Sequence, residues 1–278
     1  MTEQDLIFGK RLDSNNDDKI ALIDEIIKNN CKNVLDLGAG TCLLDFEISK
    51  HKIHVDAVDL NFKSNVFKIF DEVNEYINFY SEDIVDFVQN HSDKKYDCII
   101  LSAILHEIDP YKMLKLSKSL KNVMKHDECL VLIREPYYEM QSNKEPIKPF
   151  KSLYKQRKFW KEFSKYIPEE KITDFSGTFR KSYYCPPPPI WALNIAFTYS
   201  YGEASWAREK HEYRYAYSKQ QLIEFINDVF DKKEVNITFK TYKKDYGKHF
   251  KDIGYPDWFI DSIEYTNCLI IAKGGIIW

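Results

Sequence analysis

The residues most able to do chemistry in this 278-residue chain surround two closely spaced glycines. Asp36 precedes Gly38 and Gly40 in the segment 34–42, Val-Leu-Asp-Leu-Gly-Ala-Gly-Thr-Cys, which predicts a strand ending in a turn that opens a helix. Glycines there let the backbone approach a ligand at the carboxyl end of the strand, where doubly wound sheets bind. The Asp36 carboxylate beside the turn suits a cationic group. We therefore expect a nucleotide-like ligand at this turn.

Two familiar phosphate-binding motifs are absent from the turn. Leu43 stands where the dinucleotide fingerprint needs its third glycine, and no Gly-Lys-Ser/Thr sequence of a P-loop follows. Further acids end the next two strand-like runs. Asp59 lies 19 residues after the second glycine, and Glu82 and Asp83 follow the run after that. The alternative to a binding role, which we weigh equally, is that Glu82 or Asp83 is the N-cap of a helix beginning at Ile84.

Polar residues that suit proton transfer follow the fourth and fifth predicted strands. Ser102, His106 and Glu107 end the fourth, where a doubly wound sheet faces its ligand crevice. Histidine titrates near neutral pH, so His106 is our candidate general base, with lining of the crevice as the alternative. Glu107 and Glu135 are further catalytic candidates, although Glu135 equally suits a structural pairing with Arg134 or another cation. No metal site is expected, because His106 and Glu107 are too few ligands.

Together these segments resemble the class I S-adenosylmethionine-dependent methyltransferases. The first motif of that family is an acid followed by Gly-x-Gly, matched by Asp36, Gly38 and Gly40, and its second is an acid closing the second strand, matched by Asp59. The resemblance implies S-adenosylmethionine as cofactor, with the glycines against its amino-acid portion and Asp59 on its ribose hydroxyls. One departure is Cys42, because many members have a third glycine there.

The resemblance continues beyond these two motifs. It implies that Asp83 contacts the adenine. Ser102, placed at the crevice by the end of the fourth strand, is a further candidate cofactor-binding residue. The segment 101–108, Leu-Ser-Ala-Ile-Leu-His-Glu-Ile, is similar to the Leu-His-[His/Glu] turn of small-molecule methyltransferases. The likeness covers about residues 11–135 and resumes at the last two predicted strands.

The elements that must position these residues alternate between strand and helix. Strand-length apolar runs are 33–37, 53–60, 77–80, 96–101 and 128–133, and helical patterns are 17–29, 43–50, 62–73, 84–90 and 110–124. This alternation predicts a Rossmann-like, doubly wound α/β fold with a mostly parallel sheet. A helix over 218–230 and strands over 235–242 and 266–273 complete seven strands with a final antiparallel pair.

The region 136–217 has a different character and predicts an inserted cap, which leaves 1–135 and 218–278 as the methyltransferase core. Residues 150–217 hold 18 aromatics, and residues 140–220 hold 15 basic and 8 acidic residues. A basic, aromatic cap indicates an anionic or planar acceptor. The alternative is that the aromatics form the core of the cap itself. The candidate substrate-binding residues are Tyr199, Tyr201, Trp206 and Arg208.

Composition excludes several classes of protein. With 44% hydrophobic and 30% charged residues the chain is neither disordered nor fibrous, and no apolar run approaches the roughly 18 residues of a membrane span. The six cysteines show no Cys-x-x-Cys spacing and the start shows no secretory signal, so we expect free thiols, a cytoplasmic location and no membrane partner. A net charge of −3 predicts no general affinity for polyanions.

Three functions remain open at this point. The leading hypothesis is methyl transfer to an oxygen or nitrogen of a small, aromatic or anionic molecule. The second is methylation of RNA or a nucleotide on the aromatic cap, although the chain lacks the Asn-Pro-Pro-[Tyr/Phe] turn of enzymes that methylate exocyclic amines of bases. The third is a catalytically silent binding partner, which the intact set of acids and glycines disfavours.

Overall fold

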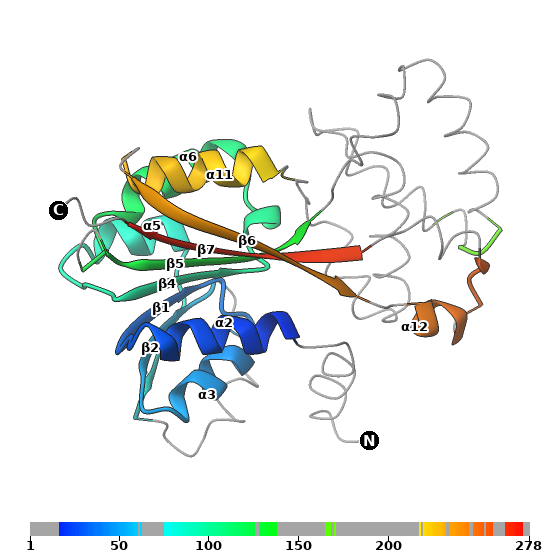
Figure 1. Ribbon diagram of the computed structural model, residues 1–278, viewed down its shortest axis with the longest axis horizontal. Coiled ribbons are helices and arrows are strands. Elements are labelled where there is room, and N and C mark those ends of the chain that lie inside the picture. The colour runs from blue at the N-terminus through cyan, green and yellow to red at the C-terminus, as the bar shows by residue number, and fades with distance from the viewer. Residues whose placement is uncertain are drawn as a thin grey trace. The chain divides into compact units, whose positions relative to one another are not determined.

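The strands form a seven-stranded sheet in the order β3-β2-β1-β4-β5-β7-β6 (Figure 1). The computed structural model describes residues 17–60, 62, 75–125, 128–137, 165–167, 170, 217, 219–231, 234–244, 247–252, 254–257 and 265–274. The strands are β1 (Asn33–Leu37), β2 (His54–Val58), β3 (Ile77–Tyr80), β4 (Cys98–Ser102), β5 (Leu130–Tyr137), β6 (Val235–Lys244) and β7 (Tyr265–Gly274).

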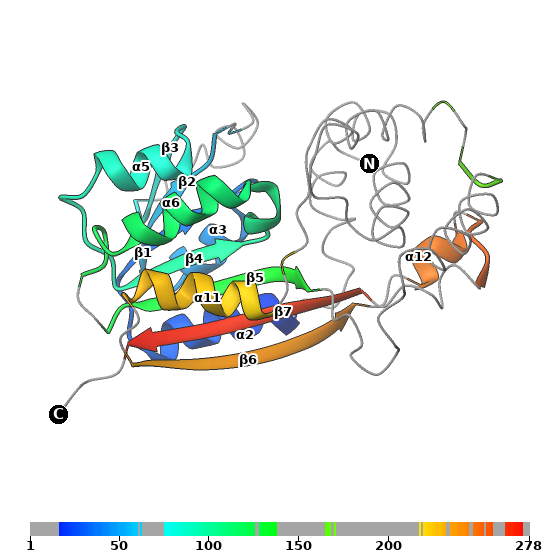
Figure 2. The same ribbon diagram turned by 90° about the horizontal axis from the view of Figure 1, so that it is seen from above.

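The first five strands are parallel to one another, and β7 runs in the opposite direction. β1 pairs in parallel with β2 and β4, β2 with β3, and β4 with β5. β7 is antiparallel to β5, and Figure 2 shows the arrows of β6 and β7 pointing in opposite directions. The predicted mostly parallel, doubly wound sheet of seven strands is therefore confirmed.

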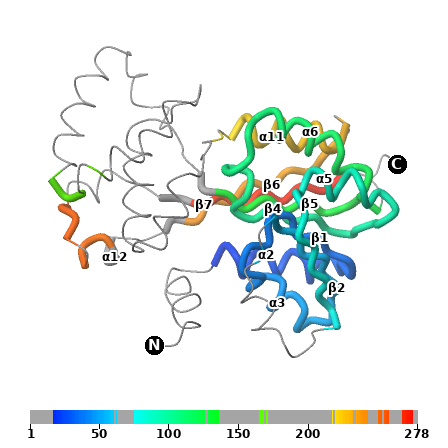
Figure 3. Tube along the Cα trace, turned by 180° about the vertical axis from the view of Figure 1, so that it is seen from behind, coloured from blue at the N-terminus to red at the C-terminus, as the bar shows by residue number. Residues whose placement is uncertain are grey.

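Helices cover both faces of this sheet. Figure 1 and Figure 3 show α2 and α3 on one face and α5, α6 and α11 on the other. The described helices are α2 (Asp17–Lys28), α3 (Leu43–Ser49), α5 (Ile84–Asn90), α6 (Pro110–Leu120), α11 (Lys219–Val229), α12 (Gly247–Asp252) and the single 3₁₀ turn η2 (Leu105–Glu107). The helix expected over 62–73 lies outside the described residues, apart from Phe62. None of the described helices is both long and apolar enough to cross a bilayer.

Local sequence explains where these elements begin and what they bury. α6 starts with Pro110 at its first helical position, and the Asp109 side chain accepts hydrogen bonds from the next two backbone N–H groups, of Tyr111 and Lys112. In α2 the spacing of Leu22 and Ile26 places both against the sheet, fully buried. Such packing fixes the strands whose carboxyl ends carry the predicted site.

The chain divides into two compact units. The first comprises residues 1–137, 217–243 and 266–278, and it contains most of the sheet. The second comprises 138–216 and 244–265, and its described part includes α12. Most of the predicted cap, 136–217, lies outside the described residues, so its aromatic character in three dimensions stays a prediction.

Candidate functional site

The glycine turn after β1 is docked onto the end of β2. Gly38 and Gly40 have φ angles of +85° and +57°, which glycine adopts without strain. The backbone N–H groups of Gly38 and Ala39 donate to the carbonyl of Val58 at 2.8 and 3.1 Å. Gly40 N–H donates to Asp59 Oδ2 at 3.0 Å. The first and second sequence motifs therefore meet, although 19 residues separate them.

The two glycines serve this turn in different ways. A Cβ on Gly38 would lie 2.5 Å from Ile104 Cγ1, in the loop after β4, so the close approach of two loops requires glycine there. A Cβ on Gly40 would meet only Gly38 O, at 4.0 Å, so that position needs glycine for its φ angle alone. The next positive φ is +55° at Cys42, in a residue where many of the resembling proteins have glycine.

Two carboxyl groups lie buried beneath the turn. Asp36, on β1, is 1% exposed, and Asp45, on α3, is fully buried. Burial raises the pKa of Asp36 well above its ordinary value, and the negative charges of Asp45 and Asp59 raise it further. Burial also raises the pKa of Asp45, to about 6. Both groups thus keep their protons to higher pH than exposed acids do, and a cation close to them would favour their ionised forms.

Asp45 is a site residue that was not predicted from the sequence. The signal was available, because Asp45 shares a helical face with Ile48 and Ser49, both of which are buried. An acid on the apolar face of a helix is unusual and points to a special environment. Here that environment is the underside of the glycine turn.

Glu135, which is buried on β5, pairs with the partly buried His106 in the turn after β4. Glu135 is 2% exposed, and its Oε1 accepts hydrogen bonds from Ile104 N–H at 2.8 Å and Leu105 N–H at 2.6 Å. Its Oε2 lies 2.7 Å from His106 Nδ1. A carboxylate accepts, so Nδ1 carries the proton in neutral His106 and Nε2 keeps its lone pair. Glu107 Oε1 lies 3.7 Å from that Nε2. This arrangement has the chemistry of an oriented base.

The structural pairing that we considered for Glu135 is not with Arg134. Arg134 Nε donates to Asp18 Oδ2 at 2.7 Å, and Asn267 Nδ2 donates to the same oxygen at 2.7 Å. Arg134 also donates to Ser102 Oγ at 3.3 Å. Alternate residues of a strand face opposite sides of the sheet, so Arg134 and Glu135 diverge. The arginine is directed to α2 and the glutamate to the turn after β4.

Asp83 takes the capping position that sequence analysis left open. Its Oδ1 accepts from the backbone N–H groups of Val85 and Asp86 at the start of α5, at 2.9 and 3.4 Å. Its Oδ2 accepts from Lys112 at 2.9 Å. The capping alternative is therefore confirmed for Asp83, and the adenine contact stays a prediction. The predicted substrate-binding residues, Tyr199, Tyr201, Trp206 and Arg208, lie outside the described residues.

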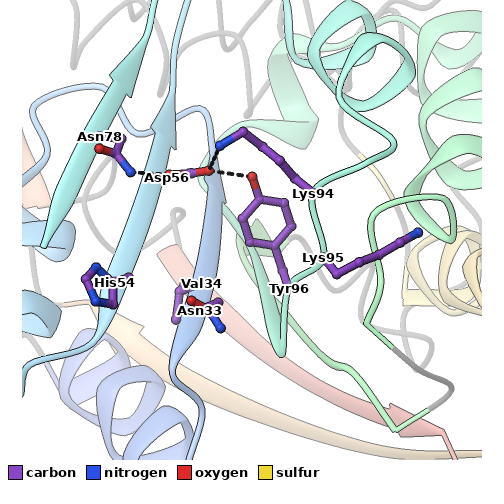
Figure 4. A pocket seen from close by; sticks show the side chains of 8 residues that line it. All are labelled: Asn33, Val34, His54, Asp56, Asn78, Lys94, Lys95 and Tyr96. Carbon is purple, nitrogen blue, oxygen red and sulfur yellow. Dashed lines mark hydrogen bonds and ion pairs between the residues drawn. The ribbon is translucent and has the colours of Figure 1, made fainter.

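A separate polar pocket of about 360 Å³ opens at the other end of the strands (Figure 4). Asp56 lies at its centre and accepts from Asn78 at 2.8 Å, Lys94 at 2.9 Å and Tyr96 at 2.6 Å. Lys94 also donates to the Tyr80 hydroxyl at 2.8 Å. These groups satisfy one another and fasten the loop before β4 to β2 and β3. The remaining residues that line the pocket are Asn33, Val34, His54 and Lys95.

No protein-family model and no curated protein matches the chain. Among solved structures, the YcgJ protein from Bacillus subtilis is similar with a TM-score of 0.52 and 13% identity, over 94% of this chain and 100% of that one. A SAM-dependent methyltransferase from Archaeoglobus fulgidus has a TM-score of 0.47 and 14% identity, over 92% of this chain and 94% of that one.

A third similar structure is the 1,6-didemethyltoxoflavin-N1-methyltransferase of Burkholderia thailandensis, solved with 1,6-didemethyltoxoflavin and S-adenosylhomocysteine bound. Its TM-score is 0.49 at 9% identity, over 92% of this chain and 77% of that one. At 13% identity, the likeness to the YcgJ protein concerns the fold alone. The chain therefore shares the fold of that protein, a doubly wound α/β sheet that here has seven strands and an antiparallel β7.

Proposed function

We propose that this protein transfers the methyl group of S-adenosylmethionine to an oxygen or nitrogen of a small, aromatic or anionic molecule. The observation that carries the proposal is the double role of Ile104. Its side chain packs against Gly38 in the glycine turn, and its backbone N–H donates to Glu135, which holds His106. One residue thus joins the predicted cofactor turn to the predicted base.

The residues around the turn fit this cofactor. S-Adenosylmethionine supplies a methyl group on a positively charged sulfonium, together with an ammonium group and ribose hydroxyls. We assign Gly38 and Gly40 to its amino-acid portion and Asp59 to its ribose hydroxyls. In support, a Cβ on Gly40 would meet only a carbonyl oxygen at 4.0 Å, and the Asp59 carboxylate already accepts from Gly40 N–H at 3.0 Å. Asp36 Oδ1 is buried and has no hydrogen-bond partner in the described structure, which suits a site that receives a cation.

His106 and Glu135 supply the proton-transfer chemistry. A hydroxyl or protonated amine becomes a better nucleophile when it loses its proton, and Nε2 of His106 is the atom that can accept it. Glu135 holds the imidazole through Nδ1 and stabilises the positive charge that the ring then gains. General-base assistance of this kind contributes about 10²- to 10⁴-fold in rate. The composition of residues 140–220 supports an anionic or planar acceptor.

The test is methyl transfer itself. The protein is incubated with methyl-labelled S-adenosylmethionine and cell extract that has been separated into small-molecule, RNA and protein fractions. We expect label in the small-molecule fraction. Label found only in RNA would show that the acceptor is RNA and not a small molecule. No label in any fraction, together with no calorimetric binding of S-adenosylmethionine, would overturn the proposal.

A variant of His106 then tests the base. Replacing His106 by Asn should lower kcat by roughly a hundredfold or more, with partial recovery at high pH as the acceptor loses its proton unaided. Weaker acceptor binding without recovery would mean that His106 positions the acceptor. The matched control is His54→Asn, because His54 lies at the opposite end of the strands.

A further inference from the structure

Two acids that lie nine positions apart in sequence meet in the interior beneath the glycine turn. Asp36 is the fourth residue of β1, and Asp45 is the third residue of α3. They are 1% and 0% exposed, and burial and the negative charge of Asp45 raise the pKa of Asp36, so the two carboxyl groups interact directly. A carboxyl–carboxyl hydrogen bond needs a proton on one partner, because two carboxylates have only acceptors.

Among the described residues, the electrostatic partners of this pair include no positively charged group that could replace the proton. The groups that face it are Asp59 at the end of β2, the thiol of Cys42 in the turn and the thiol of Cys98 on β4. Among the described residues, Asp36 Oδ1 and both oxygens of Asp45 are buried and find no hydrogen-bond donor. Two buried carboxylates side by side cannot both stay ionised without a compensating cation or proton.

We propose that Asp36 and Asp45 share one proton in the ligand-free protein and that the cationic methyl donor, on binding at the glycine turn, displaces this proton into solvent. The inference rests on the function proposed above, and it adds Asp45 as a residue of the cofactor site. Charge balances in the exchange. One proton leaves the carboxyl pair and one positive charge arrives above it, so the buried site keeps the same net charge.

This exchange makes cofactor affinity depend on pH. While the pair is protonated, each unit of rising pH should raise the association constant up to about tenfold, because binding releases a proton. The cofactor also carries an α-amino group, which titrates at about 7.7–8.0 in model peptides. The rise in the association constant should therefore be measured at pH values below that range. If both acids were already ionised near neutral pH, the association constant would not change with pH in this range.

The experiment is calorimetric titration of the full chain with S-adenosylmethionine at about pH 7, in phosphate and again in imidazole buffer. The two buffers differ in ionisation enthalpy, so the difference in apparent binding enthalpy counts the protons released. We expect about one proton per cofactor bound. Binding with a proton count near zero would overturn the inference and leave the methyltransferase proposal intact. Absence of binding would overturn both.

The variant Asp45→Asn tests whether the released proton comes from the Asp36–Asp45 pair. Asparagine can donate to Asp36 without needing a shared proton, so we expect binding to persist and the proton count to fall well below that of the wild type. The control is Asp231→Asn, which removes the same charge from an exposed ion pair with Lys121. An unchanged count in Asp45→Asn would place the proton elsewhere and refute the pair as its source.

Discussion

Replacing Gly38 by alanine probes the contact that joins the two halves of the site. Alanine at φ +85° carries the cost of a left-handed conformation, about 1–2 kcal/mol, offset in part by about 0.4–1 kcal/mol from a less flexible unfolded chain. The new Cβ would also lie 2.5 Å from Ile104 Cγ1, so Ile104 must move. Overpacking of this kind costs about 1–3 kcal/mol. We expect a total loss of about 2–4 kcal/mol in the free energy of unfolding.

Gly40→Ala is the matched control. It has a similar backbone cost at φ +57° and no overlap, because its Cβ would meet only a carbonyl oxygen at 4.0 Å. We expect a loss of about 1 kcal/mol or less. Urea unfolding followed by circular dichroism measures both values, with unchanged slopes showing that the two-state description holds.

A double variant tests the cause of the difference. Ile104→Ala removes Cγ1 and Cδ1, which would lie 2.5 and 2.8 Å from the new Cβ, and keeps its own Cβ at 2.7 Å. The overlap is therefore relieved only in part, and we expect a coupling energy of about 1 kcal/mol between the two substitutions. Equal losses in Gly38→Ala and Gly40→Ala, or strict additivity with Ile104→Ala, would refute the reasoning.

Three further predictions concern the acids of the site. Asp59→Ala should weaken S-adenosylmethionine binding by about 2 kcal/mol, since a charge-assisted contact is lost, and unchanged calorimetric affinity would remove the ribose assignment. Glu135→Gln should lower kcat by roughly 10²–10⁴-fold with little change in the KM for the acceptor, because the amide no longer favours a proton on Nδ1 of His106. A change confined to KM would contradict the role of Glu135 in orienting His106. The free energy of unfolding of Asp45→Asn should rise relative to that of the wild type as the pH rises through about 6, because a carboxyl with a raised pKa stabilises the fold only while it is protonated. The shift from 3.8 to about 6 amounts to about 3 kcal/mol. Parallel curves of stability against pH between about pH 4 and 8 would count against this prediction.

The fold was predictable from sequence because its strands and helices alternate and each strand is short, apolar and bounded by polar residues. The bounds were less accurate where tertiary contacts decide them. Tyr96 was expected to begin the fourth strand, yet it forms an isolated bridge to Met124, and its side chain turns to Asp56. β5 extends past Pro136, which has no N–H, because pairing with β4 has already ended at Arg134 and only β7 continues.

The candidate site was predictable to a different degree in its two halves. The residue types and spacing of the glycine turn led directly to Asp59, and the structure places that carboxylate on Gly40 N–H. The partner of Glu135 could not be read from sequence, since it depends on the conformation of the loop after β4, where Ala103 has a φ of +59°. The meeting of Asp45 with Asp36 likewise depends on how α3 lies against β1.

The antiparallel pairing of β7 with β5 has a consequence for the order in which the chain folds. Leu130 of β5 pairs with Lys273 of β7, so one edge of β5 stays unpaired until residues 265–274 have been synthesised. β1 to β5 can pair earlier through their crossovers, which span far fewer residues. In that interval β5 exposes unpaired backbone and the run Leu-Val-Leu-Ile, a surface suited to pairing with another nascent chain. A chain that stops before β7 should therefore aggregate during synthesis, even though every predicted cofactor-binding residue is already present.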